Sequence, residues 1–187
     1  MRSEQPGMAP GEADWPALAL VNTRVSGTRG VLDRLAGPDD LLVWLARQNL
    51  PTGGRVDADE FVTFTGLRDA AREVLSSVEL RRPPARSAIS RINRLASEPV
   101  RPVLGLDRTL RWEPVGTPAA EAAVARDVIR LASSDVALRL RTCAADDCDR
   151  MFIQDHGRRV WCSVQCGNRM RVRRHATRHR TRPTDLA

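Results

Sequence analysis

The chain has 187 residues, 42% of them hydrophobic, and carries a formal net charge of +7 with no lysine. This length suffices for one core-bearing domain and a small appendage, and the ordinary apolar fraction excludes a wholly disordered chain. No window approaches about 18 consecutive apolar residues and no hydrophobic segment stands near the start, so we expect a cytoplasmic protein without a membrane span or signal peptide.

The part of the chain before the cysteines is predicted to be mainly helical. A polar leader with two prolines and two glycines occupies residues 1–14. Apolar residues at helical spacing, separated by proline- and glycine-bearing breaks, then predict five helices. These cover residues 15–24, 37–50, 57–80, 88–97 and 118–134. Pro38, Asp39 and Asp40 mark the start of the second helix, where the helix dipole favours negative charge.

Between the fourth and fifth predicted helices, the spacing of apolar residues changes from helical spacing to alternation. Leucines and a tryptophan alternate with polar residues on both sides of a turn at Asp107 and Arg108. Alternation of this kind is typical of a half-buried strand pair. We therefore predict one β-hairpin over residues 100–115.

The helical part shows no obvious catalytic set. It contains no histidine, no cysteine and no glycine-rich phosphate loop. Its aromatic residues would suit a ligand pocket, but aromatic residues on apolar faces usually belong to the core. We assign four of them to packing: Trp44, Phe61, Phe64 and Trp112.

All four cysteines fall within 24 residues, with the spacing C-x4-C-x13-C-x3-C. Two close pairs separated by a medium loop are typical of a zinc site in a reducing compartment. Four thiolates close a tetrahedron around zinc and leave no position for water, so the site would be structural. Scattered buried thiols or a redox pair are the alternatives. The predicted ligands are Cys143, Cys148, Cys162 and Cys166.

The cysteine region has few large apolar residues, so metal binding would supply much of its folding free energy. The expected layout is a turn with the first two cysteines, strands at 151–154 and 158–162, and a helix. Ser163 would cap this helix, and Cys166 would lie in its first turn. Three histidines compete as ligands without forming an obvious second set: His156, His175 and His179.

A basic segment follows the cysteines. Residues 142–187 hold ten arginines against five acidic residues, and residues 169–182 hold seven arginines and no acidic residue. This density favours a polyanionic partner. An arginine-rich, lysine-free composition is also typical of a GC-rich, bacterial genome.

On a helix the arginines would form two rows, since each residue advances about 100°. The row on the side of the cysteines is Arg169, Arg173 and Arg180. The opposite row is Arg171, Arg174, Arg178 and Arg182. The first row, with Arg150, could balance the net charge of −2 of a zinc bound by four thiolates, and the role of Arg158 and Arg159 stays open. The second row sets like charges three or four residues apart, which phosphates would relieve, although a solvated face is the alternative.

The stretch "CGNR" at 166–169, with the preceding "WCS", resembles the CGNR zinc-finger family. "LALVNT" at 18–23 and "PDDLLVWL" at 38–45 resemble the opening of the helical ABATE domain, which this family pairs with the finger in stress-induced transcription regulators. The linker "IQDHGRRVW" departs from the family pattern. The resemblance implies zinc on the four cysteines and DNA contact by the basic segment. The contact residues would be Arg169, Arg171, Arg173, Arg174 and Arg178.

The sequence thus predicts a mainly α fold in four parts. A flexible leader at 1–14 precedes a helical ABATE-like domain at 15–138 with one β-hairpin. A small four-cysteine zinc finger at 139–182 ends in a basic helix, and 183–187 form a tail.

The predicted function is a non-enzymatic, DNA-binding transcription regulator with zinc as its cofactor and duplex DNA as its partner. Its N-terminal domain would sense a small molecule or stress signal, or form a homodimer. The alternative is an RNA- or protein-binding adaptor that uses the same basic patch. An enzyme with its site in the helical domain is a third hypothesis, which no motif supports.

Overall fold

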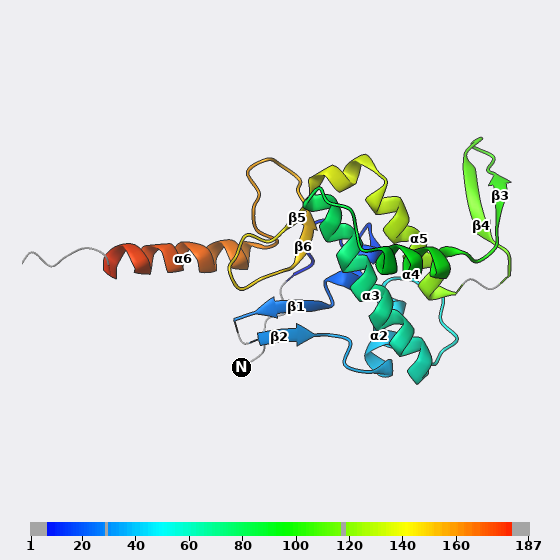
Figure 1. The fold of residues 1–187 in the computed structure, drawn as a ribbon, viewed down its shortest axis with the longest axis horizontal. Coiled ribbons are helices and arrows are strands. Elements are labelled where there is room, and N and C mark those ends of the chain that lie inside the picture. Colours follow the sequence, from blue (N-terminus) through cyan, green and yellow to red (C-terminus); the bar gives the residue numbers. More distant parts are fainter. Residues whose placement is uncertain (1–6, 29, 117–118, 181–187) are drawn as a thin grey trace, which may run out of the picture.

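The computed structural model describes residues 7–28, 30–116 and 119–180. Helices form the body of the molecule, one helix projects from one end, and a β-hairpin projects from the other (Figure 1). None of the described helices is long and apolar enough to cross a bilayer. The tail 183–187, the first six residues of the leader and Arg182 lie outside the described residues.

Helices and strands follow in chain order. The helices are α1 (Pro16–Val21), α2 (Pro38–Arg47), α3 (Ala58–Glu79), α4 (Arg86–Ala96), α5 (Ala120–Ala132) and α6 (Val164–Arg180), with a short 3-10 helix η1 (Asp135–Arg139). The strands are β1 (Arg24–Gly27), β2 (Gly30–Asp33), β3 (Val100–Leu104), β4 (Leu110–Pro114), β5 (Leu140–Thr142) and β6 (Met151–Ile153). They pair as three antiparallel, two-stranded sheets: β1 with β2, β3 with β4, and β5 with β6.

The five predicted N-terminal helices are confirmed; four are shorter than predicted, and α4 begins two residues earlier, at Arg86. Pro38 opens α2, and Asp39 and Asp40 lie in its first turn. Asp57 caps α3, because its Oδ1 accepts the Glu60 N–H at 2.8 Å. Neighbouring residues determine where α2 and α3 begin, so the sequence alone locates these helix starts.

The hairpin of β1 and β2 was not predicted. Its eight residues do not alternate, and Val25 is the one buried side chain in its strands. A distant residue holds it in place: the Asp149 carboxylate accepts the Ser26 N–H at 2.7 Å and the Ser26 hydroxyl at 3.0 Å. Because this contact spans 123 residues, no local pattern reveals the hairpin.

The main core surrounds α3, which packs against α1, α4 and α5. Large, fully buried members of this core include Leu18, Leu41, Phe64, Leu67, Leu75 and Leu131. The rings of Trp44 and Phe64 meet edge to face with centroids 6.2 Å apart, and Phe61 packs against the same core. Packing is confirmed for these three aromatic residues.

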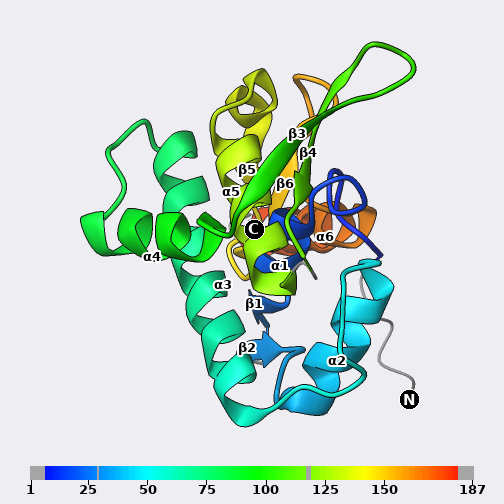
Figure 2. The ribbon, with the colours of Figure 1, turned by 90° about the vertical axis from the view of Figure 1, so that its right-hand side faces the viewer.

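The packing role predicted for Trp112 is wrong. Its side chain is 61% exposed. The confirmed hairpin of β3 and β4 extends beyond the helices, so its residues have no neighbouring layer to pack against (Figure 2).

Strand β6 belongs to two cores. Met151 and Ile153 lie in the main core, whereas Phe152 lies in a second cluster with three of the cysteines. Successive side chains of a strand point to opposite faces, so three residues suffice to join the two clusters. The predicted strand at 151–154 is confirmed as β6, which pairs with β5, whose Leu140 lies in the main core. The predicted strand at 158–162 is wrong, because these residues form turns and bends before α6.

Polar contacts fasten the same strand to the N-terminal segment. Asn22 donates to the Met151 carbonyl at 2.7 Å and accepts the Met151 N–H at 2.9 Å. The carboxylate of Glu12 makes two hydrogen bonds to Arg150, at 2.7 and 2.9 Å, and both side chains are buried. The second half of the predicted leader is therefore folded against β6.

We predict that Glu12→Ala lowers the free energy of unfolding by about 3–5 kcal/mol, because it leaves the Arg150 charge buried and unpaired. Urea denaturation of the zinc-loaded protein measures this loss. The matched control is Glu113→Ala, which breaks the exposed pair of Arg101 and Glu113 and should cost about 1 kcal/mol or less. Equal losses in the two variants would contradict the structural role of the buried pair.

Candidate metal centre and basic helix

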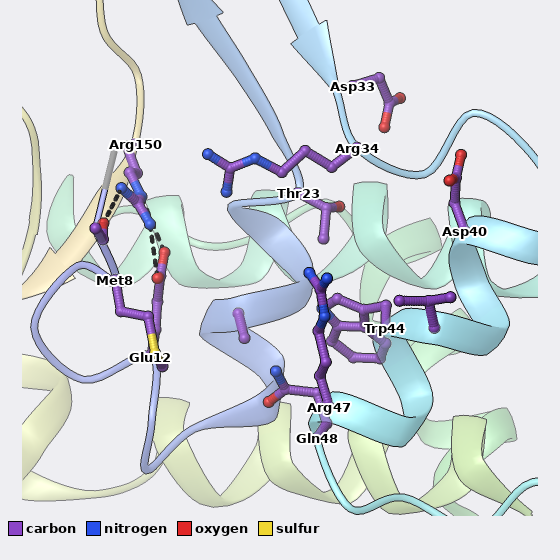
Figure 3. Close-up of a pocket in the computed structure, with 13 residues that line it drawn as sticks. Met8, Glu12, Thr23, Asp33, Arg34, Asp40, Trp44, Arg47, Gln48 and Arg150 are labelled. Atoms are coloured by element: carbon purple, nitrogen blue, oxygen red, sulfur yellow. Dashed lines mark hydrogen bonds and ion pairs between the residues drawn. The ribbon is translucent and has the colours of Figure 1, made fainter. Parts of the chain in front are cut away.

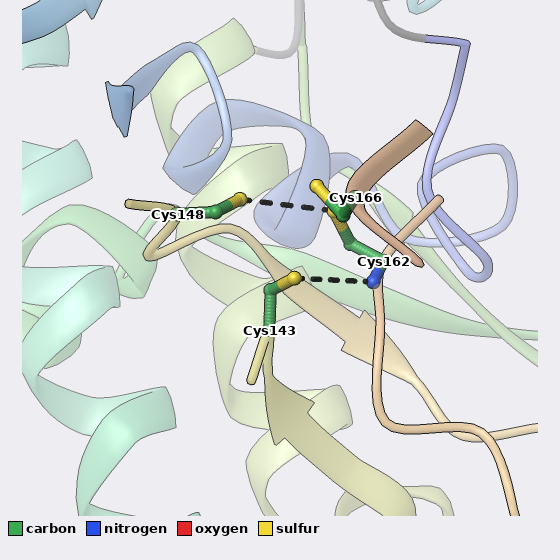
Figure 4. A group of neighbouring side chains, drawn as sticks. All are labelled: Cys143, Cys148, Cys162 and Cys166. Atoms are coloured by element: carbon green, nitrogen blue, oxygen red, sulfur yellow. Dashed lines mark hydrogen bonds between the residues drawn. The ribbon is translucent and has the colours of Figure 1, made fainter. Parts of the chain in front are cut away.

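The four cysteine sulfurs gather in one place, all within 4.8 Å of one another (Figure 4). Cys143 follows β5, Cys148 precedes β6, Cys162 precedes α6, and Cys166 lies in the first turn of α6. The predicted cap is confirmed, because the Ser163 Oγ accepts the Cys166 N–H at 3.2 Å. A hairpin and a helix start thus bring together two pairs that are distant in sequence.

The sulfur spacing suits a tetrahedral zinc ion. Four sulfurs bound to zinc at about 2.3 Å lie about 3.8 Å apart. The sulfur of Cys162 lies 3.8 Å from that of Cys148 and 3.6 Å from that of Cys166. Among the described residues, no histidine or carboxylate joins this group. The donor set is therefore four sulfurs, which fits a closed structural site.

Crowding makes three of the thiols, Cys143, Cys148 and Cys162, difficult to ionise together without a cation. Hydrogen bonds from Cys148 and Cys162 lower the pKa of Cys143. The hydrogen bond with Cys143 raises the pKa of Cys148, and those with Cys143 and Cys148 raise the pKa of Cys162. A divalent metal reverses this preference, because it attracts thiolates and deprotonates them.

An acidic residue beside the sulfurs pairs with two members of the first arginine row, and the side chain of the third, Arg180, lies outside the described residues. The Asp147 carboxylate accepts two hydrogen bonds from Arg169, the shorter at 2.7 Å, and also pairs with Arg173 at 3.1 Å. This hydrogen bonding lowers the pKa of Asp147 and raises that of Arg169. Arg169 also reaches the Cys166 sulfur at 3.5 Å. Our sequence analysis missed Asp147, although an acidic residue between two cysteines and before an arginine-rich helix is a readable signal.

The other arginines considered for charge balance are engaged elsewhere or lie in solvent. Arg150 pairs with Glu12, and Arg159 pairs with Asp155 at 2.7 Å. Arg158 is exposed. Among the described side chains, Arg169 is thus the arginine that contacts a cysteine sulfur.

A small apolar cluster covers the cysteines and explains the glycine of "CGNR". Phe152, Met170 and Ala145 are buried around the sulfurs, and Trp161 packs against them. A Cβ atom at Gly167 would lie 3.1 Å from the Trp161 ring. Glycine therefore lets the indole lie against the first turn of α6.

Two arginines of the second row lie close to the same indole ring. The guanidinium groups of Arg171 and Arg174 each lie 5.9 Å from the Trp161 ring centroid, within cation–π range. Arg171 also donates to the Asn168 side chain at 2.8 Å. Arg178 belongs to α6, but its side chain lies outside the described residues.

Beyond the cysteines α6 leaves the body of the molecule. Up to residue 177, where the description of the side chains ends, Met170 is the last buried residue of the helix, and every residue from 171 to 177 is exposed. Figure 1 shows this helix projecting from one end of the molecule. The structure thus presents a basic helix whose first turn is held by the cysteine cluster and whose residues 171–177 are exposed, with contacts to Trp161 and Asp147 near its base.

Comparison with known families agrees with this division. Residues 14–135 match the ABATE family, described as "Putative stress-induced transcription regulator", and residues 139–179 match the CGNR zinc finger. A comparison with curated proteins found no significant match. Neither family description names an enzymatic activity, and the second match spans all four cysteines and most of α6. The chain therefore belongs to the ABATE family and ends in a CGNR zinc finger, with zinc as its cofactor.

Proposed function

We propose that the protein is a DNA-binding transcription regulator. In this proposal Cys143, Cys148, Cys162 and Cys166 hold one zinc ion, which fixes the first turn of α6. The rest of α6 presents its arginines to the phosphates of a duplex. The observation that carries the proposal is the exposure of residues 171–177 on a helix with six arginines and no acidic residue.

The exposed part of α6 lacks the usual reason for a helix to form. No side chain is buried from residue 171 to residue 177, and like charges three or four residues apart cost roughly 0.2–0.5 kcal/mol per pair. A polyanion removes this repulsion and replaces it with charge-assisted hydrogen bonds. The 17 residues of α6 span about 25 Å, and the major groove of B-DNA admits a helix.

The two arginine rows take different roles. Asp147 engages Arg169 and Arg173, so we give these two residues the task of orienting α6 against the finger. Arg171 and Arg174 lie on the Trp161 side and have no acidic partner among the described residues. We assign the phosphate contacts to Arg171, Arg174 and, from its place in the helix, Arg178.

Duplex DNA suits this surface better than single-stranded RNA. Binders of single strands stack bases on exposed aromatic platforms. Within the described part of the finger, Trp161 is partly buried and flanked by two arginines, so it offers no open face. A regulator of this kind works in the cytoplasm, and we assign signal sensing or dimerisation to the N-terminal domain.

Loss of one ligand tests the metal assignment. We predict that the unmodified protein binds one zinc ion per chain. In Cys162→Ser, we predict that the zinc is lost and the finger becomes disordered, because three sulfurs leave the tetrahedron open. The main core should also lose stability, since β6 is shared. Elemental analysis and near-UV circular dichroism measure these changes.

The control is Val164→Ser, a change at an exposed position beside the cysteines. It should retain one zinc per chain. Full zinc retention in Cys162→Ser would refute the assignment of the ligands.

Replacement of the second arginine row tests DNA binding. The triple variant Arg171→Gln, Arg174→Gln and Arg178→Gln should bind duplex DNA more weakly and keep its zinc. The slope of log affinity against log salt should flatten by up to about 3 units, because each lost phosphate contact removes about 0.9. Fluorescence anisotropy at several salt concentrations measures both quantities.

A charge-matched control uses exposed arginines without a side-chain partner among the described residues: Arg55, Arg86 and Arg94. Their replacement by Gln removes the same charge and should leave DNA affinity nearly unchanged. Equal losses from the two triples would indicate diffuse electrostatic attraction. An unchanged affinity of the α6 triple variant for duplex DNA would show that α6 is not the DNA-binding element.

A further inference from the structure

A pocket of about 790 Å³ lies where the leader and the N-terminal helices meet Arg150, which follows the second cysteine (Figure 3). Its walls come from the leader turn, the end of α1, the segment after β2, and α2. Its lining includes polar and charged side chains together with the apolar side chains of Met8, Val43 and Trp44. The pocket thus offers both a charged and an apolar wall.

The acidic side chains of this pocket already have partners. Glu12 pairs with Arg150 at 2.7 Å. Asp33 pairs with Arg68 at 2.7 Å, and Asp40 accepts the Ala36 N–H at 2.9 Å. Glu12 and Asp33 are thus compensated by arginines, whereas Asp40 is exposed and accepts a backbone N–H.

Two arginines of the pocket lack such partners. The Nη2 atom of Arg34 is buried and makes no hydrogen bond within the described residues. Burial lowers the pKa of Arg34, and the charge of Arg150 lowers it further, while Glu12 acts in the opposite direction. Arg47 on α2 is exposed and forms no hydrogen bond or ion pair within the described part of the chain. Both side chains line the pocket, and Figure 3 shows Arg34 extending from the segment after β2 toward Arg150 and Arg47 extending from α2 beside Trp44.

A buried guanidinium nitrogen without a partner costs free energy that an anionic ligand recovers. The planar fork of a guanidinium matches the two oxygens of a carboxylate or phosphate. Trp44 and Val43 stand beside the arginines on α2, where they can cover an apolar portion of a ligand.

We propose that this pocket binds a small organic anion, whose carboxylate or phosphate group pairs with Arg34 and Arg47 and whose apolar part rests on Trp44. This inference rests on the sensing role proposed for the N-terminal domain. Binding of the anion in this pocket would also affect the finger, because Arg150 lines the pocket and lies two residues after Cys148.

The test is a titration of the full-length, zinc-loaded protein with inorganic phosphate or benzoate, against chloride at equal ionic strength. The readout is the indole N–H signal of Trp44 in ¹H–¹⁵N NMR spectra, assigned with Trp44→Phe. We expect a saturable shift with at least one of the two anions and none with chloride. The anion that saturates tells a phosphate site from a carboxylate site.

Variants locate the site. Arg34→Gln and Arg47→Gln should each weaken anion binding by about tenfold, as expected for loss of one charge-assisted contact. Arg94→Gln, on the exposed face of α4, should leave it unchanged. The melting temperature of Arg34→Gln without ligand should stay the same or rise, because a buried unpaired charge is removed. If Arg34→Gln fails to fold, the anion affinity of Arg47→Gln alone tests the location of the site.

The proposal is overturned if neither anion gives a saturable shift, or if the two pocket variants bind as the unmodified protein does. A lower melting temperature of Arg34→Gln with unchanged anion binding would make Arg34 a structural residue and overturn it as well. The titration contains no DNA, so its failure would leave DNA binding by α6 intact. A loss of DNA binding would likewise leave the pocket result intact.

Discussion

The alternation of side chains along β6 is the constraint on which the rest of the structure depends. Met151 and Ile153 complete the helical core, and Phe152 between them completes the cluster around the cysteines. The zinc finger is therefore joined to the helical body through a common strand. The buried pair of Glu12 and Arg150 strengthens this joint from the leader side. Changes on one side of β6 consequently reach the other through rigid packing.

This joint gives α6 a fixed direction. Cys166 anchors its first turn at the metal centre, and Asp147 holds Arg169 and Arg173 along the next. The helix then projects from the body of the molecule with residues 171–177 exposed (Figure 1), so the contacts named here that orient it lie at its base. A signal that alters the N-terminal domain near Arg150 would act at this base, where a small displacement moves the far end of the helix most.

Local patterns predicted the helices and the cysteine cluster, because periodicity, caps and ligand spacing are written in neighbouring residues. Contacts over long sequence separations account for what was missed. A hydrogen bond to Asp149 positions the hairpin of β1 and β2, and the burial of Leu140 in the main core places β5 beside β6. Arg68 likewise stands on a helix yet is buried against Asp33. The unpartnered Nη2 atom of Arg34 is visible only once all its neighbours are placed.

Hydrogen exchange along α6 tests the central claim most directly, because it reports on the helix itself in the free and DNA-bound protein. The account predicts rapid exchange of the amides of residues 171–177 in the free, zinc-loaded protein, since no packing protects them. A saturating duplex should slow their exchange and leave that of the β3–β4 hairpin unchanged. Unchanged exchange in α6, with slowed exchange elsewhere in a protein that binds the duplex, would contradict the account.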